Sequence, residues 1–422
     1  MQTKSLFYFN PSDGTSVLPK DGYEFLLGTI YPTQSEVTLW LFMPKATAEA
    51  RTHLQIRMQV TSDDSAEIAR TKGKFSTVRV LDENRNTVDY GFGMHAWNRL
   101  NFDTNVSSFD GRPAVKLYIE NANGLRLDFT RPTFDSDVLP DAPLLGGAEL
   151  IQQASARRLG MGYILTAPQG QTLVIDGGRS SKGDLIGDYK QLERVLTERG
   201  GYVSDWFLTH YHNDHIGAVI EFLRSENDIV IENLYYDFSC DKDFLAKHEG
   251  VEANLITELE QAVLQSGKVK NTVKVKKGDC IARGGLLVKV LNNAYFQSPS
   301  NLSNDSSVIY KVETPGENIL FLGDMGNYGT ALLHDPDFVK EIEDCMIVQM
   351  AHHGQEGTEE VFYRALKKMQ ICLYPAQSWL FDCNGGEGLG TGIWLSMITR
   401  SWMRELDVRK TYSMADGEIT IR

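Results

Sequence analysis

The chain has 422 residues, which is long for a single hydrophobic core and indicates about two domains. Hydrophobic residues make up 42% and charged residues 23%, an ordinary globular composition, and the formal net charge is −14. Such an acidic chain disfavours long nucleic acids as partners, because their phosphates attract basic proteins.

The cysteines and the first residues give hints about the compartment. The five cysteines are scattered, odd in number and without a CxxC pair, which argues against a disulfide framework and is typical of a reducing compartment. The first ten residues contain no long apolar core and no small-residue cleavage site. The sequence therefore predicts no signal peptide and no transmembrane segment, and we expect a cytoplasmic protein.

Residues 1–140 are rich in short runs of β-branched and aromatic residues separated by turn sequences. Several runs alternate apolar and polar residues, as residues 54–60 do. Short, regularly spaced strands predict a β-sandwich, with one helical piece near residues 64–71. The predicted strands are residues 23–31, 37–43, 54–60, 75–80 and 114–120.

Aromatic residues of this region raise the question of a binding surface. Trp40, Tyr90, Phe92 and Trp97 are candidates for a sugar-binding face, although aromatic residues of a sandwich more often belong to its core. We therefore expect an accessory module with a glycan or a protein as its candidate partner.

A linker with two prolines at residues 135–146 is followed by strands that alternate with helices. Several apolar strands of this second region end in polar residues. Because sites in α/β sheets are normally built on loops at strand ends, we expect these residues to converge. They are Asp176, the cluster from His210 to His215, Asp324, and the pair His352 and His353.

The stretch 210–215 packs three histidines and an aspartate into six residues, between an apolar strand and a helix. His210 and His212 are two residues apart, so in extended backbone they project to the same side. Imidazole and carboxylate together form a ligand set for zinc or a similar first-row metal. With Asp324 and the later histidine pair, the donors suffice for two metal ions about 3.5 Å apart, as in binuclear hydrolases.

The order of these motifs resembles the metallo-β-lactamase superfamily. HxHxDH at residues 210–215 is preceded by Asp-Gly-Gly at 176–178 and followed by Gly-Asp at 323–324 and His-His-Gly at 352–354. The sequence looks most similar to the hydrolase domain of ComEC-type DNA-uptake proteins and their soluble relatives, through residues 304–309, the His-His-Gly and the closing strand. The resemblance covers about residues 148–422, so the predicted domains are 1–140 and 148–422.

The resemblance implies an αββα sandwich with the metals at one edge of two packed sheets, preceded here by the N-terminal β-sandwich. By the family's motif, His210 and His212 would hold the first metal. Asp214 and His215 would hold the second, and Asp324 would bridge the two. Asp214 would also orient the nucleophile.

His353 would complete the second site, with His352 as the alternative, and Asp176 would brace the metal loop from behind without binding metal. Most of the superfamily has a further histidine near the position of residues 292–307, which the ComEC-like branch also lacks. This stretch offers other polar residues instead, namely Asn301, Asn304, Asp305 and Ser306. Asp305 is the candidate substitute ligand.

The expected function is a metal-dependent hydrolase. A metal-activated hydroxide would attack a phosphodiester in a nucleotide or another phosphorylated small molecule. One or two zinc ions are the expected cofactors, with manganese as the alternative. Hydrolysis of a carboxylic ester, lactone, thioester or β-lactam on the same scaffold is the competing activity. A non-catalytic metal-binding or sensing protein is the competing class.

Overall fold

The computed structural model describes residues 7–10, 28–30, 36–43, 50–62, 75–109, 111–130, 132–141, 143–154, 159–181, 188–240, 242–298 and 301–422. The predicted helix near 64–71 and most of the predicted strand at 23–31 lie outside these ranges. Contacts divide the chain into two compact units. Unit 1 is Met1–Pro140 with Asp382–Lys410, and unit 2 is Asp141–Phe381 with Thr411–Arg422.

Unit 1 is built on two β-sheets, as the N-terminal sequence predicts. Leu54, Ile56, Met58 and Val60 alternate along one strand and point into a core that both sheets share. The first sheet has the order β1 (Phe7–Asn10), β3 (Glu36–Phe42), β9 (Arg112–Glu120), β5 (Arg79–Leu81) and β6 (Thr87–Tyr90), with β8 (Ser107–Phe109) on β9. The second has the order β11 (Thr133–Asp135), β4 (Arg51–Thr61), β10 (Arg126–Phe129) and β2 (Gly28–Ile30), with β7 (Trp97–Asn105) on β4.

The late segment Asp382–Lys410 completes unit 1, which differs from the predicted domain of residues 148–422. Its helix α11 (Ser396–Glu405) presents two buried arginines to the sandwich. Arg404 Nε lies 2.7 Å from Asp89 Oδ2, and Arg404 and Arg400 each donate to the backbone carbonyl of Tyr90 at 2.8 Å. The Tyr90 hydroxyl donates to Asp382 Oδ1 at 2.6 Å. These buried polar contacts bind the segment to the N-terminal strands.

The four aromatic candidates for a sugar-binding face do not share a face. Phe92 is fully buried in the core, and Tyr90 lies under the guanidinium of Arg400. Trp40 belongs to the first sheet, whereas Trp97 belongs to the second and is 37% exposed.

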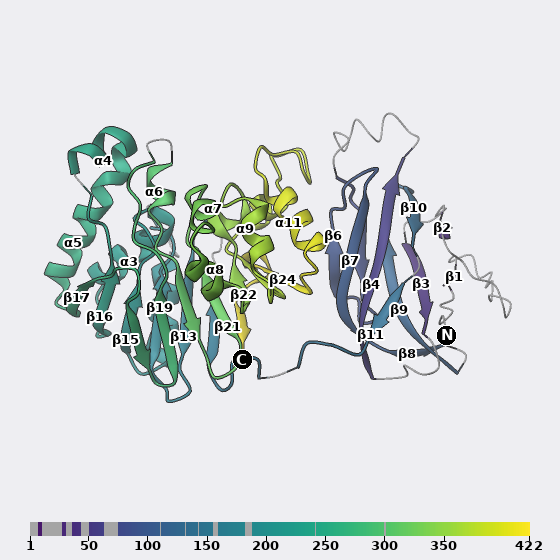
Figure 1. The fold of residues 1–422 in the computed structure, drawn as a ribbon, viewed down its shortest axis with the longest axis horizontal. Helices are drawn as coiled ribbons and strands as arrows, with labels where there is room; N and C mark the ends of the chain where they lie inside the picture. Colours follow the sequence, from purple (N-terminus) through teal and green to yellow (C-terminus); the bar gives the residue numbers. More distant parts are fainter. Residues whose placement is uncertain are drawn as a thin grey trace. The chain divides into compact units, whose positions relative to one another are not determined.

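Unit 2 holds two seven-stranded sheets among the described residues (Figure 1). The first sheet has the order β17 (Val269–Lys274), β16 (Val230–Tyr236), β15 (Tyr202–Phe207), β14 (Thr172–Asp176), β13 (Gly162–Thr166), β12 (Glu149–Gln152) and β25 (Ile419–Ile421). The second has the order β18 (Cys280–Arg283), β19 (Leu286–Val290), β20 (Tyr310–Glu313), β21 (Asn318–Phe321), β22 (Cys345–Gln349), β23 (Ile371–Tyr374) and β24 (Lys410–Ser413).

The two sheets of unit 2 face each other through aromatic side chains. Tyr163 meets Phe321 at 5.0 Å between ring centroids, and Phe207 meets Tyr310 at 5.3 Å. The outer face of the first sheet packs against α2 (Asp188–Glu198), α3 (Asn213–Arg224) and α5 (Asn254–Ser266) in one apolar cluster. Helices α8 (Pro336–Ile342) and α9 (Glu360–Ala365) lie on the side of the second sheet (Figure 1). The unit is therefore the αββα sandwich that the family resemblance implies.

The remaining helices are short. They are α4 (Lys242–Glu249), η2 (Gly250–Ala253), α6 (Leu302–Asp305), α7 (Tyr328–Leu332), η3 (Ala351–Gly354), α10 (Ser378–Phe381) and η4 (Met414–Asp416). Among the described residues, every helix is too short or too polar to cross a bilayer.

Candidate metal centre

The histidine cluster begins where β15 ends and finishes in the first turn of α3. His210 and His215 are fully buried, whereas His212, at the N-cap of α3, is only partly buried. His210 Nε2 and His212 Nδ1 lie 3.1 Å apart, so the two imidazoles converge on one side of the loop. The spacing of two residues in extended backbone accounts for this.

Asp176 lies behind the cluster, at the end of β14, with φ of 51°. Its two carboxylate oxygens accept hydrogen bonds from the backbone amide and the hydroxyl of Thr209, both at 2.7 Å. Its Oδ2 also accepts a hydrogen bond of 2.7 Å from His215 Nδ1. Because Nδ1 carries the proton, the other ring nitrogen of a neutral His215 is free to act as a donor to a metal.

Asp324 follows β21 in a tight turn that two neighbours hold in place. Its backbone amide donates to Ser307 Oγ at 3.0 Å. Gly323 has φ of 59°, and a Cβ there would lie 2.9 Å from Oγ1 of Thr209 and Oγ of Ser307. Glycine is therefore required both by the backbone conformation and by the close approach.

Gln349, the last residue of β22, joins this turn to the next candidate loop. Its Oε1 accepts from the amides of Leu322 and Gly323 at 2.7 and 2.9 Å. Its Nε2 donates to the carbonyls of Gly323 and Met350. The side chain is fully buried, so its bonds hold the turn before Asp324 against the end of β22.

His352 and His353 follow β22 in left-handed backbone, with φ of 49° and 58°. This conformation costs free energy in residues other than glycine, and it is typical of functional loops. His353 is fully buried, and its Nδ1 donates to the carbonyl of Pro375 at 2.7 Å. Its Nε2 therefore points away from that carbonyl, and its lone pair could bind a metal ion.

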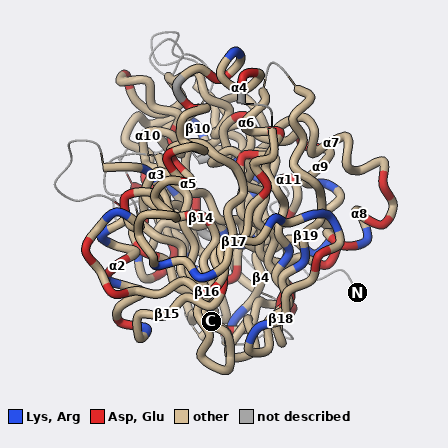
Figure 2. The backbone as a smooth tube through the Cα atoms, turned by 90° about the vertical axis from the view of Figure 1, so that its left-hand side faces the viewer, with Lys and Arg blue, Asp and Glu red and all other residues tan. Residues whose placement is uncertain are grey.

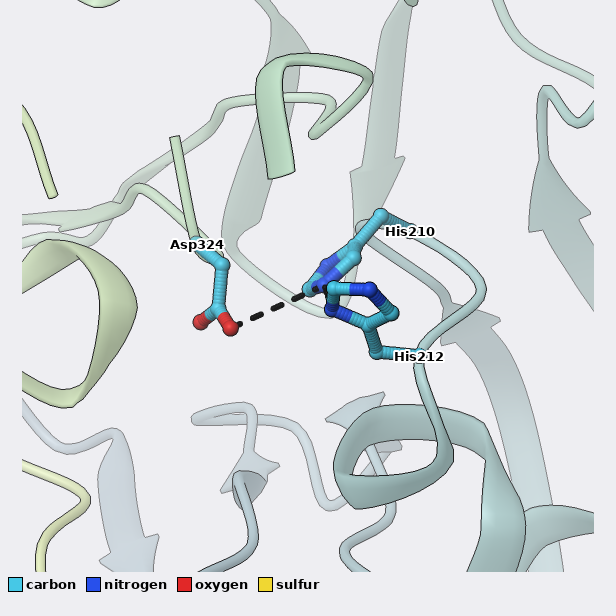
Figure 3. A group of neighbouring side chains, drawn as sticks. All are labelled: His210, His212 and Asp324. Atoms are coloured by element: carbon cyan, nitrogen blue, oxygen red, sulfur yellow. Dashed lines mark hydrogen bonds and ion pairs between the residues drawn. The ribbon is translucent and has the colours of Figure 1, made fainter. Parts of the chain in front are cut away.

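Six of the predicted site residues form two groups that could each hold a metal ion. The first group is His210, His212 and Asp324, and the second is Asp214, His215 and His353. Within each group the donor atoms lie within 4.8 Å of one another. Figure 3 shows His210 and His212 facing the Asp324 carboxylate, whose Oδ2 is 3.7 Å from His210 Nε2.

Asp324 lies between the two groups. Its Oδ1 is 3.0 Å from His215 Nε2, and its Oδ2 is 3.5 Å from His353 Nε2. The third member of the second group, Asp214, has its Oδ2 3.4 Å from His353 Nε2. One carboxylate thus reaches donors of both groups, as the predicted bridging residue would.

The donor atoms themselves indicate that these groups suit a cation. His215 Nε2, His353 Nε2 and Asp324 Oδ1 are buried and make no hydrogen bond of good geometry, although they lie 3.0 to 3.5 Å from carboxylate or imidazole atoms of the same cluster. Buried polar atoms without a good hydrogen bond cost about 1–3 kcal/mol each, so an ion between these groups would be stabilising. Divalent metal ions bind imidazole nitrogen and carboxylate oxygen, so the residues present fit a metal.

The electrostatics of the cluster are those of buried opposite charges. Burial opposes the charged forms of His210, Asp214 and His353. For His353 the carboxylates of Asp324 and Asp214 outweigh burial and raise the pKa to about 9. For His210 burial dominates, assisted by the neighbouring His215, and the pKa falls well below its usual value. Burial raises the pKa of Asp214, but His353 and His215 outweigh it and hold that pKa below its usual range.

Two of the predicted candidate ligands lie beside the groups rather than in them. Asp305 Oδ1 accepts from the backbone amide of Tyr328 at 3.2 Å, and neither group includes Asp305. His352 Nε2 is 3.9 Å from Asp324 Oδ2, yet His352 also belongs to neither group. Its side chain is 18% exposed, so it borders the site at a position that solvent reaches.

Several supporting residues have no recognisable signal in the sequence. The Thr209 hydroxyl lies 3.1 Å from His210 Nδ1 and donates to Asp176, so it connects the two. Ser307, Gln349 and the Pro375 carbonyl act from distant parts of the chain. Gln349 alone could have been suspected of a supporting role, because it is a polar residue at the end of an apolar strand.

A model of the metallo-β-lactamase superfamily matches residues 159–276, a range that includes Asp176 and the histidine cluster. No curated protein matches the sequence significantly. Similar solved structures include YhfI, a metallo-β-lactamase fold protein of Bacillus subtilis, at 11% identity and a TM-score of 0.42, covering 65% of this chain and 99% of that one. Zinc-bound PqqB of Methylobacterium extorquens has 10% identity and a TM-score of 0.35, with coverages of 65% and 99%. A diphosphatase of the PhnP family has 13% identity and a TM-score of 0.33, with coverages of 54% and 85%.

Proposed function

We propose that this chain, whose residues 159–276 belong to the metallo-β-lactamase superfamily, is a metal-dependent hydrolase of a phosphodiester. The substrate would be a nucleotide or another phosphorylated small molecule. The observation that carries the proposal is the position of Asp324, whose two oxygens reach histidines of both donor groups at 3.0 to 3.7 Å.

In this proposal His210, His212 and Asp324 hold one ion, and Asp324 extends to the other group. Asp214, His215 and His353 hold the second ion. When bound, divalent ions such as zinc or manganese polarise a substrate oxygen and make water a stronger nucleophile near neutral pH. Paired sites suit phosphodiesters, because attack and departure at phosphorus both place negative charge on oxygen.

The protein's own groups would orient the reactants. Asp214 is held in the ionised form by His353 and His215, so it can accept a hydrogen bond but cannot donate one. Its side chain is 14% exposed, whereas those of His210, His215 and His353 are fully buried. Asp214 therefore stands at the accessible side of the cluster, where it can align a water molecule for attack.

The charge pattern of unit 2 favours a small substrate over a long nucleic acid. Lys270, Lys274 and Lys277 pair with Glu232, Asp237 and Asp335. Figure 2 shows basic residues interspersed with acidic ones near β17 and α8, without a stripe of one sign. Long nucleic acids require an extended basic surface, which a net charge of −14 disfavours.

Metal content measured by mass spectrometry, followed by assays on chromogenic esters, tests this proposal. We expect about two metal ions per chain and metal-dependent hydrolysis of bis(p-nitrophenyl) phosphate in preference to p-nitrophenyl acetate and nitrocefin. Asp324→Ala should lose metal and activity together. The matched control is Asp205→Asn, which alters another buried aspartate, on β15, and should keep both.

Each contrary result has its own meaning. Preference for the carboxylic ester or for nitrocefin would replace the phosphodiester by a carbonyl substrate. Full metal occupancy without turnover on any ester would leave a metal-binding or sensing protein. Absence of bound metal after incubation with zinc and manganese would exclude the catalytic proposal.

A further inference from the structure

Asn304 carries a buried polar atom that the protein leaves without a partner. The residue lies in α6 and is 8% exposed. Its amide nitrogen donates to Asn301 Oδ1 at 2.8 Å, which fixes the orientation of the amide. Its amide oxygen Oδ1 is buried and accepts no hydrogen bond. Because an unpaired buried acceptor costs about 1–3 kcal/mol, this oxygen calls for a partner from outside the chain.

The segment around Asn304 is held against both loops that carry the first donor group. On one side, Ser303 Oγ donates to the hydroxyl of Tyr211 at 3.1 Å, and Tyr211 stands between His210 and His212 in the sequence. On the other side, Ser307 Oγ accepts from the backbone amide of Asp324 at 3.0 Å. Residues 303–307 therefore bridge the histidine loop and the Asp324 loop.

The segment that carries Asn304 packs closely against the chain just beyond Asp324. A Cβ on Gly326 would lie 2.1 Å from Asn301 Nδ2 and 2.6 Å from Asp305 Oδ1. Asn301, which orients Asn304, is thus pressed against the chain two residues beyond Asp324. The residue that orients the unpaired oxygen is therefore closely packed against the Asp324 loop.

The two donor groups are unequal without a further ligand. The second group has Asp214, His215 and His353, and the Asp324 carboxylate lies 3.0 Å from His215 Nε2 and 3.5 Å from His353 Nε2. It therefore has four donor side chains, two of them carboxylates. The first group has three donor side chains, with Asp324 as the single carboxylate.

We propose that Asn304 supplies its amide oxygen to the first group as the fourth donor. This inference rests on the proposed function only in treating the two groups as metal sites, and it holds for any substrate. A neutral amide oxygen is a hard, weak donor that suits manganese or magnesium better than an additional imidazole would. The first ion is therefore bound more weakly than the second, and the first group accepts manganese readily.

Titration of the metal-free, full-length protein with Mn²⁺, read from the electron paramagnetic resonance signal of the free ion, tests this without any activity assay. The native protein should bind two Mn²⁺ ions with separate affinities. Asn304→Ala should raise the Kd of the weaker ion by at least about tenfold and leave the tighter one unchanged. Asn304→Asp keeps the shape and the oxygen and adds a charge, so it should bind the first ion at least as tightly as the native protein.

Asn292→Ala is the matched control, because Asn292 is a buried asparagine of the same region whose amide serves the backbone of Ser307 and Ile309. It should lower stability without changing the difference between the two Kd values. Unchanged binding of both ions in a folded Asn304→Ala protein would overturn the proposal. So would loss of the first ion in a folded Asn304→Asp protein, which also decides the matter if the alanine variant fails to fold.

These outcomes separate this inference from the proposed function. Loss of the weaker ion in Asn304→Ala, in a protein that hydrolyses no ester, would uphold the ligand and refute the hydrolase. Hydrolysis by the native protein, together with unchanged manganese binding in Asn304→Ala, would uphold the hydrolase and refute Asn304 as a ligand. A native protein that binds no Mn²⁺ would overturn this inference, and it would overturn the proposed function as well if the protein also binds no zinc.

Discussion

Asp176 and His215 are joined by a hydrogen bond of 2.7 Å on the side of the imidazole ring opposite Asp324. Both side chains are fully buried. The aspartate therefore fixes which ring nitrogen carries the proton and where the other one points, although Asp176 itself belongs to neither donor group.

Replacement of Asp176 tests this arrangement. An amide in Asp176→Asn can accept through one atom only, so it cannot keep all three hydrogen bonds to Thr209 and His215. We expect the metal Kd of the second group to rise about 10–100-fold. Metal competition with a chromogenic chelator measures it. Asp205→Asn should leave the Kd unchanged, and an equal loss in both variants would show a general loss of folding instead.

Gly354 is expected to be intolerant of any side chain. Its φ is 79°, and a Cβ would lie 2.3 Å from the Tyr374 ring. Gly354→Ala should lower the free energy of unfolding by about 2–4 kcal/mol, from backbone strain and overpacking together. Urea unfolding measures this. In a Tyr374→Leu background, the cost of overpacking should disappear and only the backbone strain at residue 354 should remain. Additive effects of the two substitutions on the free energy of unfolding would contradict the contact between residue 354 and the Tyr374 ring.

Replacement of Gln349 should lower both the stability of the protein and its affinity for metal ions. Gln349→Leu leaves the amides of Leu322 and Gly323 without their acceptor, at a cost of about 2–4 kcal/mol in unfolding free energy. The turn before Asp324 should loosen, so both metal ions should bind more weakly. Gln370→Leu is the control, because that side chain is partly exposed and its Oε1 accepts no bond. Wild-type metal affinity in Gln349→Leu would contradict the bracing.

The stability of unit 1 should depend on pH through Asp89. Burial raises the pKa of this carboxyl group, but Arg404 and Arg400 outweigh burial and lower the pKa below its usual value. The folded pKa is thus below the unfolded value of about 4. The stabilisation is therefore present above that pH and is lost as the pH falls through the folded pKa.

Hydrogen–deuterium exchange in α11 measures this contribution. Asp89→Asn should lower the free energy of opening that protects the backbone amides of α11 from exchange by about 2 kcal/mol at pH 7. The reason is that Arg404 then stays buried without its carboxylate partner. The difference between variant and native protein should shrink as the pH falls below about 4. A difference that stays constant from pH 7 to pH 3 would show that the charge on Asp89 is not its source.

The alternation of strands and helices in unit 2 and the convergence of its polar loops could be predicted from local sequence, whereas the αββα arrangement was implied by the family resemblance. Each candidate loop directly follows a buried apolar strand, and neighbouring strands of an α/β sheet bring such loops together. The role of Asp305 could not be predicted in this way. Its carboxylate is engaged by the backbone amide of Tyr328, 23 residues away, and nothing near Asp305 in the sequence announces that partner.

The assignment of Asp382–Lys410 to unit 1 could not be predicted for a similar reason. Arg400 and Arg404 have the residue type of a solvated helix face, and arginine is rarely buried unless paired. The partner that buries Arg404 is Asp89, 315 residues earlier in the chain. Long-range pairs of this kind leave no periodic pattern in a single sequence.

The division of unit 1 into two separate segments has a consequence for the order of synthesis. Domains usually fold from the N-terminus as the ribosome releases them, at about 5–20 residues per second. Here Asp382–Lys410 is made long after the N-terminal strands of the same unit, because it follows most of unit 2. The delay is on the order of tens of seconds at that rate. Unit 1 therefore lacks one of its two segments for that time, which makes chaperone dependence during expression an expected property of this protein.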